Sequence, residues 1–383
     1  QKSKEMYSRI TQKIIFNTVE QSGVPMSTQL NSMEIRDLTS NDLVKKVHFT
    51  YGSIGSQPRR LLSSVTMEGD SQQTEPPYMF DYFTDQTLPG YNSLAIDHWG
   101  YYNGVTTNTT LFPAVSNPAF GSLSGANRNP DSTNDIRYMR AGSLHKITYP
   151  SGGSTTFTYE ANDYYDSLQS ENKRAGGLRI KQITIHDGID SANNLVKSYQ
   201  YKNEIHPSRS SGYLVAGQLE LYKYYGTGVE SQNECPYVVR RTKAEGTSIG
   251  QVAAYRWVTE YLHTVTNNDG YTRYELQAAQ ETGRSVNQWR RGKVLSKSDF
   301  RNDNTLLQEK TFTHNLEKEM IDRVYGVEVA VDWVSHMDTT FTDLKFNFYS
   351  YWTTLDSESV KIFDSSGVEH VETSRELDYA TGL

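Results

Sequence analysis

The sequence predicts an all-β protein with little helix, in which antiparallel β-hairpins stack into extended, curved or shell-like sheets. The first observation behind this prediction is composition: the 383 residues include 27 Tyr and 27 Gly but only 11 Pro. Tyr favours half-buried pleated surfaces and Gly serves tight turns, so this pairing indicates many short strands. The second observation is a strand-turn-strand pattern that recurs along the chain. Because an isolated hairpin is only marginally stable in water, several of them imply lateral pairing.

Each copy of the pattern has the same order of parts. Alternating apolar residues lead into a cluster of Asp, Asn, Gly or Ser, the chain re-enters at an apolar residue, and it often ends on an aromatic-x-aromatic motif. The period of two would place one side of each ribbon against a core and the other side in water. Six segments fit the pattern: residues 33–51, 62–83, 144–160, 183–201, 294–314 and 360–371.

The first three predicted hairpins precede residue 161. In the first, MEI is followed by a polar loop from Asp37 to Asp42, and the chain returns as LVKKVHFTY. In the second, VTM precedes the loop EGDSQQTEPP, and the returning strand YMFDYF ends at Phe83. The third is the clearest, because LHKITY leads through the turn PSGG into STTFTYE, which ends at Glu160.

The last three predicted hairpins follow the same order. In the fourth, ITI precedes the loop HDGIDSANN, and LVKSYQY ends at Tyr201. In the fifth, VLSKSDF turns at RNDN, and LLQEKTFTH ends at His314. In the sixth, VKIF turns at DSSG, and VEHV ends at Val371. A helical pattern occurs in NLEKEMIDRV, whose apolar residues are spaced four apart and predict a short amphipathic helix: Leu316, Met320 and Val324.

A long irregular stretch separates two parts of the chain. Residues 106–137 are rich in Asn, Ser, Thr, Gly and Pro. A stretch of this length and composition is more often a surface excursion than part of a packed core. We therefore predict an N-terminal strand-rich region, residues 1–140, which carries this excursion, and a hairpin-repeat region, residues 141–383.

Charge and hydropathy exclude several classes of protein. Lys and Arg total 38 against 45 Asp and Glu, so the formal net charge is -7 and we expect no nucleic-acid partner. The longest apolar runs are four residues, Tyr213–Ala216 and Val252–Tyr255. A membrane-spanning helix needs about 20, so we expect no membrane-spanning segment. A single cysteine, Cys235, excludes an internal disulfide framework.

The sequence contains no recognisable catalytic or metal-binding motif. The segment GSLSG has Leu123 where a serine nucleophile would stand, and neither a phosphate-binding loop nor H-E-x-x-H is present. The loop acids Asp187 with Asp190, and Asp299 with Asp303, lack the D-x-D-x-D-G spacing of a high-affinity calcium loop. We therefore predict a non-enzymatic protein with no cofactor and no metal.

The densest group of chemically useful side chains lies in DHWGYYNG, residues 97–104. It puts the rings of Trp99, Tyr101 and Tyr102 beside the polar Asp97 and Asn103. Flat rings with polar neighbours can bind a sugar or a peptide, which makes these residues a candidate ligand site. Alternatively, the rings cover the open end of a sheet and their polar tips cap it. We favour the second interpretation, since large aromatic side chains dominate core burial.

Several separated segments resemble a known group of proteins. DHWGYYNG, LHKITYPSGGSTTFTYE, AGGLRIKQITIHDG and WRRGKVLSKSDF together resemble the large Bacteroidetes surface proteins of the Rhs/YD-repeat type, in the strand-rich region that precedes their repeat-associated core. The resemblance extends from about Met33 to the end of the chain. The segment SVKIFDSSGVEHVETSRELDYATG is similar to a diverged YD repeat, with Phe363 and Asp364 where the family has Tyr-Asp and Gly367 at its turn.

The resemblance implies secretion and exposure at the bacterial cell surface, often with a long β-sheet shell and a variable C-terminal effector. It carries over no catalytic residue, because the shared motifs are strands and turns. We therefore expect a structural scaffold segment that meets an unknown protein or glycan partner at the cell surface. The alternative is a carbohydrate- or peptide-binding surface module centred on Trp99.

Overall fold

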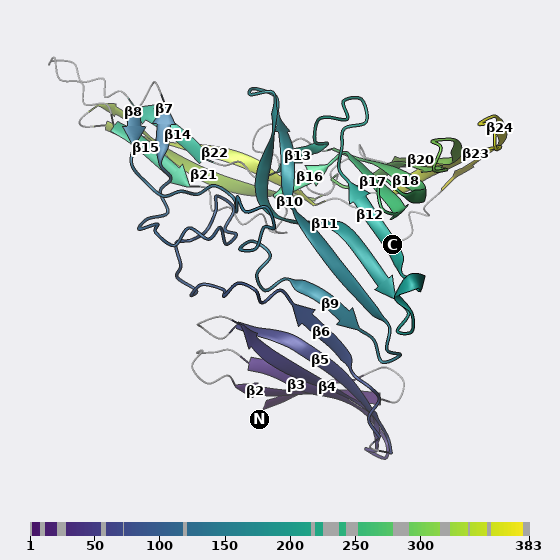
Figure 1. The fold of residues 1–383 in the computed structure, drawn as a ribbon. Helices are drawn as coiled ribbons and strands as arrows, with labels where there is room; N and C mark the ends of the chain where they lie inside the picture. The colour runs from purple at the N-terminus through teal and green to yellow at the C-terminus, as the bar shows by residue number, and fades with distance from the viewer. Residues whose placement is uncertain are drawn as a thin grey trace. The chain divides into compact units, whose positions relative to one another are not determined.

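The fold is known from a computed structural model. It describes residues 2–7, 12–20, 28–54, 59–71, 73–117, 121–215, 219–224, 237–242, 252–278, 291–314, 322–335, 338–350 and 354–377. Within these residues, sixteen strands form one sheet in the order β1-β2-β3-β4-β5-β6-β9-β10-β11-β12-β17-β18-β19-β20-β23-β24 (Figure 1). The predicted all-β class, with antiparallel hairpins stacked in one large sheet, is confirmed.

The strands of this sheet lie in the order in which they occur in the sequence. In its first part they are β1 (Lys2–Tyr7), β2 (Gln12–Glu20), β3 (Thr28–Asp37), β4 (Leu43–Ile54), β5 (Arg59–Gly69), β6 (Tyr78–Tyr82), β9 (Leu144–Thr148) and β10 (Ser154–Asp166). They continue as β11 (Glu171–His186), β12 (Leu195–Gln200), β17 (Trp257–His263), β18 (Asn268–Leu276), β19 (Val294–Phe300), β20 (Leu306–His314), β23 (Leu355–Phe363) and β24 (Glu369–Glu376).

Four small two-stranded sheets accompany the large one. They are β7 (Val115–Asn117) with β8 (Gly121–Leu123), β13 (Gly212–Leu214) with β16 (Ala253–Tyr255), β14 (Leu219–Tyr224) with β15 (Tyr237–Thr242), and β21 (Asp322–Ser335) with β22 (Asp338–Ser350). In the described part of the chain, helical structure is limited to a short 3-10 turn, Ser191–Asn193.

All six predicted hairpins are present as adjacent strands. They are β3-β4, β5-β6, β9-β10, β11-β12, β19-β20 and β23-β24. The turn of the third hairpin has the expected glycine geometry, because Gly152 has a φ of 90° and the Tyr149 N–H donates to the Gly153 carbonyl at 2.8 Å. The predicted helix is wrong at Val324, which pairs with Phe348 in β21-β22, while Leu316 and Met320 lie outside the described residues. Valines at alternate positions of β21 favour an extended strand over a helix there.

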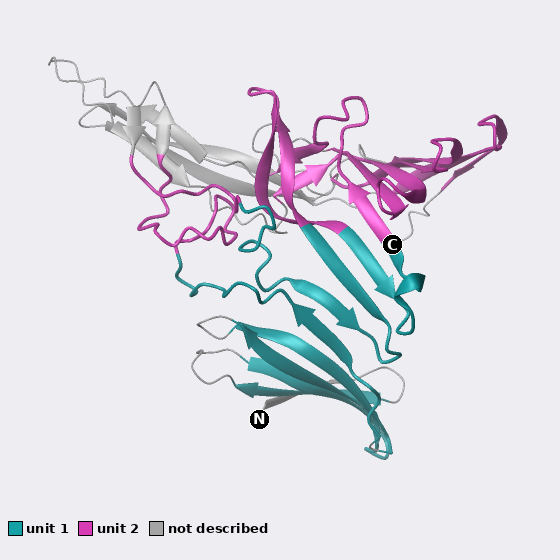
Figure 2. Ribbon diagram, in the orientation of Figure 1, with its two compact units in different colours: residues 1–93, 133–159, 182–196 teal, residues 94–132, 160–181, 197–383 magenta. Residues whose placement is uncertain are grey.

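The contacts divide the chain into two units (Figure 2). Unit 1 comprises residues 1–93, 133–159 and 182–196, and unit 2 comprises residues 94–132, 160–181 and 197–383. Each unit therefore combines segments that are distant in the sequence. The proposed division near residue 140 stays a prediction about domains.

Burial is less one-sided than the period-two pattern predicts. The residues of β6 alternate between half-buried and exposed, as expected, but every residue of β19 is half-buried and every residue of β24 is exposed. In β19 both faces have cross-strand neighbours: the Phe300 ring stacks on Tyr271 at 4.7 Å, while Asp299 accepts a 2.6 Å hydrogen bond from Thr272. Pairing between neighbouring strands thus shields both faces.

One hydrogen bond recurs in five hairpins and explains the aromatic-x-aromatic motif. The last ring of the motif reaches across to the carbonyl oxygen of an aliphatic residue on the first strand of the same hairpin. The tyrosine hydroxyls donate from Tyr51 to Leu30 (2.9 Å), Tyr82 to Leu62 (2.8 Å), Tyr159 to Leu144 (2.8 Å) and Tyr201 to Ile180 (2.7 Å). In the fifth hairpin, His314 Nε2 lies 2.8 Å from the Val294 oxygen. We call this contact the ring latch.

In four of the five hairpins a β-bulge lies beside the ring latch, directly after the residue whose carbonyl oxygen accepts the hydrogen bond. For example, Leu62 pairs with Tyr51 and Ser64 pairs with Thr50, which leaves Ser63 as an extra residue in β5. The same irregularity occurs at the equivalent point in the first, third and fifth hairpins, where the extra residues are Asn31, His145 and Leu295. The sixth hairpin has this bulge too, with Asp356 as the extra residue. A bulge changes the local twist of its strand. Its recurrence beside the latch defines a structural repeat.

Candidate functional site

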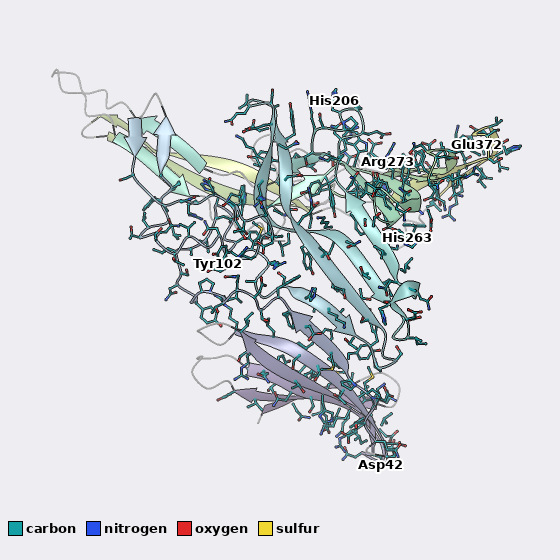
Figure 3. The ribbon with its side chains drawn as sticks, in the orientation of Figure 1. Asp42, Tyr102, His206, His263, Arg273 and Glu372 are labelled. Carbon is teal, nitrogen blue, oxygen red and sulfur yellow. The ribbon has the colours of Figure 1, made fainter. Side chains whose placement is uncertain are left out.

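The five predicted site residues lie together in unit 2, on the irregular segment before β9. Figure 3 marks the position of this segment by the label on Tyr102. Asp97 is fully buried and Asn103 is 5% exposed. Trp99, Tyr101 and Tyr102 are half-buried. The segment is therefore packed by its polar residues as well as by its rings. We call residues 97–104 the Asp97 turn.

The carboxylate of Asp97 organises this turn. Its Oδ1 accepts hydrogen bonds from the backbone N–H groups of Trp99 and Tyr101, both at 2.9 Å. The Asp97 N–H in turn donates to the Tyr101 carbonyl oxygen at 2.8 Å. Gly100 and Gly104 have φ angles of 92° and 76°, in the left-handed region that favours glycine.

The Asp97 turn packs against two consecutive glycines of β11. A Cβ on Gly176 would lie 2.6 Å from Asp97 Oδ2 and 2.9 Å from the Trp99 ring. A Cβ on Gly177, whose φ is 82°, would lie 3.0 Å from the Tyr101 ring. The absence of both side chains is therefore what allows the turn to approach the strand. The glycine pair is visible in AGGLRIKQ, but nothing in the sequence shows what approaches it.

The rings of the turn extend a small hydrophobic core. Tyr164, Ala175 and Val252 are buried together, and Trp99 and Tyr101 pack against them. This placement favours the interpretation in which the aromatic residues cover the sheet. Tyr102 does not belong to this cluster, although its backbone pairs with Ile96 in an isolated bridge.

The stretch that follows the turn is more packed than the prediction of a surface excursion allows. Arg128 is 4% exposed, and its Nε and Nη2 donate to the Asp97 carbonyl oxygen at 3.1 and 2.5 Å. Asn103 Nδ2 donates to the carbonyl oxygens of Asn127 and Asn129 at 3.2 and 3.0 Å. An irregular backbone leaves buried carbonyl groups without ladder partners, and these side chains supply the missing donors.

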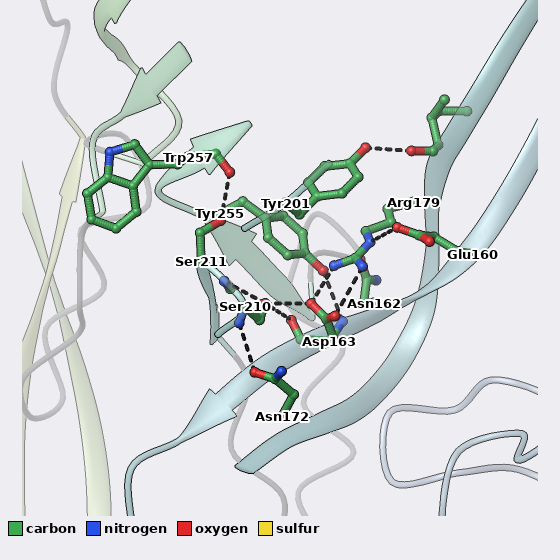
Figure 4. Close-up of polar contacts among 12 residues, drawn as sticks. Glu160, Asn162, Asp163, Asn172, Arg179, Tyr201, Ser210, Ser211, Tyr255 and Trp257 are labelled. Carbon is green, nitrogen blue, oxygen red and sulfur yellow. Dashed lines mark hydrogen bonds and ion pairs between the residues drawn. The ribbon is translucent and has the colours of Figure 1, made fainter. Parts of the chain in front are cut away.

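A second polar cluster, which the sequence analysis missed, surrounds Arg179 of β11 (Figure 4). The guanidinium makes two hydrogen bonds to Asp163, at 2.5 and 3.1 Å, and one to Glu160 at 2.8 Å. It also lies over the rings of Tyr201 and Tyr255, 4.4 and 5.0 Å from their centroids. Burial opposes the charge, but the hydrogen bonds and charges of the two carboxylates outweigh it and hold the pKa of Arg179 above its usual value.

The Arg179 cluster is connected to the Asp97 turn through β10. The Asp163 N–H donates to the Tyr255 hydroxyl at 3.1 Å, and that hydroxyl donates to Asn162 Oδ1 at 3.0 Å. Asn162 Nδ2 then donates to the carbonyl oxygen of Gly176 at 3.0 Å, at the strand position where the turn packs. Residues that are 92 positions apart thus hold one another in place. Contacts at that separation leave no local sequence signal.

This arrangement is suited to holding strands and loops together. Among the described residues, no group of three or more His, Cys, Asp or Glu is placed to hold a metal ion. The loop acid Asp187 accepts hydrogen bonds from the N–H groups of Ile189 and Asp190 in its own loop. Cys235 lies outside the described residues.

Among the described residues, no helix has the length and hydropathy that crossing a membrane requires.

Comparison with known proteins gives no family assignment. No protein-family model matches the chain, and no curated protein matches it at a significant level.

Proposed function

We propose that this chain is a non-enzymatic structural scaffold, a segment of a secreted or cell-surface protein of the Rhs/YD-repeat type. The observation that carries the proposal is the ring latch, which recurs in five hairpins and has a β-bulge beside it in four of them. A device repeated at the same place in successive hairpins is typical of a chain whose task is to extend a sheet. The segment LHKITYPSGGSTTFTYE, which carries part of the resemblance to the YD-repeat proteins, forms the strands and turn of the third hairpin.

The scaffold would act mechanically. Ladder hydrogen bonds join each hairpin to the next, and each latch adds about 1 kcal/mol, the usual net contribution of one such hydrogen bond. The Arg179 cluster and the Asp97 turn fix the irregular segments of unit 2 to β10 and β11. Loops between the strands would then be presented to a protein or glycan partner at the surface.

A proteolysis experiment on intact cells tests this proposal. We expect protease added to bacteria that carry the full-length protein to cleave it in the exposed loops around Leu168 and Ile189, whose side chains are 95% and 88% exposed. The paired strands should survive as large fragments, because backbone in a ladder resists cleavage. A cytosolic protein of the same cells is the control. Digestion only after lysis would contradict surface exposure, and digestion to small peptides would contradict the scaffold.

The alternative function is binding of a carbohydrate or peptide by the Asp97 turn. In its favour, the rings of Trp99, Tyr101 and Tyr102 each keep part of their surface exposed. Against it, Asp97 and Asn103 are buried, and Asp97 Oδ1 and Asn103 Nδ2 bond to the protein's own backbone. A ligand would therefore meet ring surface with few free polar groups, and the scaffold has the stronger support.

A further inference from the structure

The side chain of Asp97 is an unusual place for a negative charge. It is fully buried, and its Oδ2 has no hydrogen-bond partner among the described residues. The charge of Arg128 acts on this carboxylate, but Arg128 directs Nε and Nη2 to the Asp97 carbonyl oxygen. Protonation would place a neutral carboxyl group in this site, with Oδ1 still able to accept the two N–H bonds of the turn.

At the next residue, His98, the closed turn disfavours the protonated form of the side chain. The His98 ring is half-buried and packs edge-on against Trp99, with the ring centroids 5.9 Å apart. The backbone N–H of His98 donates to the Arg128 carbonyl oxygen at 3.0 Å. A proton on this ring would bring a second positive charge beside Arg128 in a partly desolvated place. To gain that proton at low cost, the ring must leave its position in the turn.

We propose that Asp97 and His98 form an opposed proton pair that keeps the Asp97 turn packed on β11 as the solution becomes mildly acidic. Asp97 takes up a proton from water while the turn stays closed, whereas His98 takes one up only when the turn opens. On acidification, proton binding by Asp97 stabilises the closed turn, and this offsets the stabilisation of the open turn by proton binding to His98. The turn therefore holds its position over a range of pH in which each residue alone would make it pH-dependent.

Two pKa shifts of opposite sign support this proposal. Burial raises the pKa of Asp97 from 3.8 to about 6, despite the N–H bonds and Arg128. The closed turn then binds more protons than the open one, so acidification below pH 6 favours closure. Burial, helped by Arg128, lowers the pKa of His98 from 6.5 to about 4. The closed turn then binds fewer protons, so acidification below pH 6.5 favours opening.

The other groups around Asp97 do not titrate in this range. Arg128 stays charged. Burial and the charge of Asp97 raise the pKa of Tyr101, so its hydroxyl stays neutral. From β11 the neighbouring residue is Gly176, without a side chain, and Arg174 of the same strand is bonded to the Asp131 carbonyl oxygen. When the pH falls from 8 to 5, the pKa shift of Asp97 raises the equilibrium constant for closing the turn about tenfold. The pKa shift of His98 lowers the same constant about 30-fold.

Hydrogen exchange of the full chain tests the proposal. Protection factors of the amides of residues 97–104 are measured at pH 5, 6, 7 and 8 for wild type, Asp97→Asn and His98→Asn. From pH 8 to pH 5 we expect protection to change by about threefold in wild type, to fall about 30-fold in Asp97→Asn, and to rise about tenfold in His98→Asn. Asp70→Asn and His206→Asn, at exposed positions, serve as controls and should follow wild type.

The double variant keeps the test decisive if one single variant packs poorly. With both groups removed, protection should be independent of pH once intrinsic exchange is factored out. The proposal is overturned if Asp97→Asn and His98→Asn both follow the wild-type profile, or if the double variant keeps a tenfold dependence on pH. Circular dichroism at pH 8 establishes that each variant retains the β-rich fold.

Discussion

Replacing Gly176 with valine should detach the Asp97 turn from β11 and destabilise unit 2 by about 3 kcal/mol, the upper range for overpacking a close contact. The Cβ alone would lie 2.6 Å from Asp97 Oδ2 and 2.9 Å from the Trp99 ring. Neither group can move easily, because Oδ1 of the same carboxylate holds two N–H groups and Trp99 packs in the core. Urea unfolding followed by far-ultraviolet circular dichroism, which reports on the strands of both units, measures the loss of stability.

Gly52→Ala is the matched control for this experiment. Gly52 also lies within a strand, β4, but a Cβ there would meet its nearest neighbour only at 4.0 Å. We expect its unfolding midpoint to stay close to that of wild type, within about 0.5 kcal/mol. If Gly176→Val were as stable as Gly52→Ala, the Asp97 turn would not be in close contact with Gly176 of β11, and this account of the packing would be wrong.

Replacing Arg179 with methionine should destabilise unit 2 by about 3 kcal/mol, because it leaves two partly buried carboxylates without their cation. The Arg179 side chain is 12% exposed, and Asp163 and Glu160 are 28% and 33% exposed. Methionine fills much of the same volume, so the loss reports on charge and hydrogen bonding more than on packing. Arg179→Lys should recover only part of the stability, since lysine cannot bond both Asp163 oxygens in parallel or stack its head group flat on a tyrosine ring.

Arg137→Met provides the comparison for Arg179→Met. Arg137 pairs with Asp135 at 3.0 Å, but the two side chains are 46% and 41% exposed. Exposed pairs of this kind add little stability, because water screens their attraction, so we expect little change in the unfolding midpoint. Equal losses in Arg137→Met and Arg179→Met would show that the Arg179 cluster is no stronger than a surface ion pair.

Local signals in the sequence were sufficient for the hairpins. The third hairpin shows why, because PSGG supplies the glycine with positive φ and the flanking residues alternate with the period of a strand. The motif FTY before Glu160 was visible as a recurring ending. Its cause, the hydroxyl of Tyr159 on the Leu144 carbonyl, depends on a bulged strand that composition does not reveal.

The site could be predicted only in part, for a physical reason. DHWGYYNG identified the residues of the Asp97 turn, but its partner Gly176 is a residue without a side chain and gives no chemical signal of its own. The contact between Tyr255 and Asn162 joins residues 93 positions apart, and pattern reading has no access to that distance. At Val324 the helical spacing was misleading, because pairing with β22 determines the structure there.

Engineered disulfides test most directly the central claim, that successive hairpins pair side by side in one sheet. Met79 of the second hairpin lies opposite Thr148 of the third. Cysteines at opposed antiparallel positions have Cα atoms about 4.5–5.5 Å apart, within reach of a disulfide. In a Cys235→Ser background, we expect Met79→Cys/Thr148→Cys to cross-link on mild oxidation. Met79→Cys/Ile147→Cys should not, because neighbouring strand residues point to opposite faces. Equal cross-linking of both pairs, or of neither, would contradict the stacked sheet.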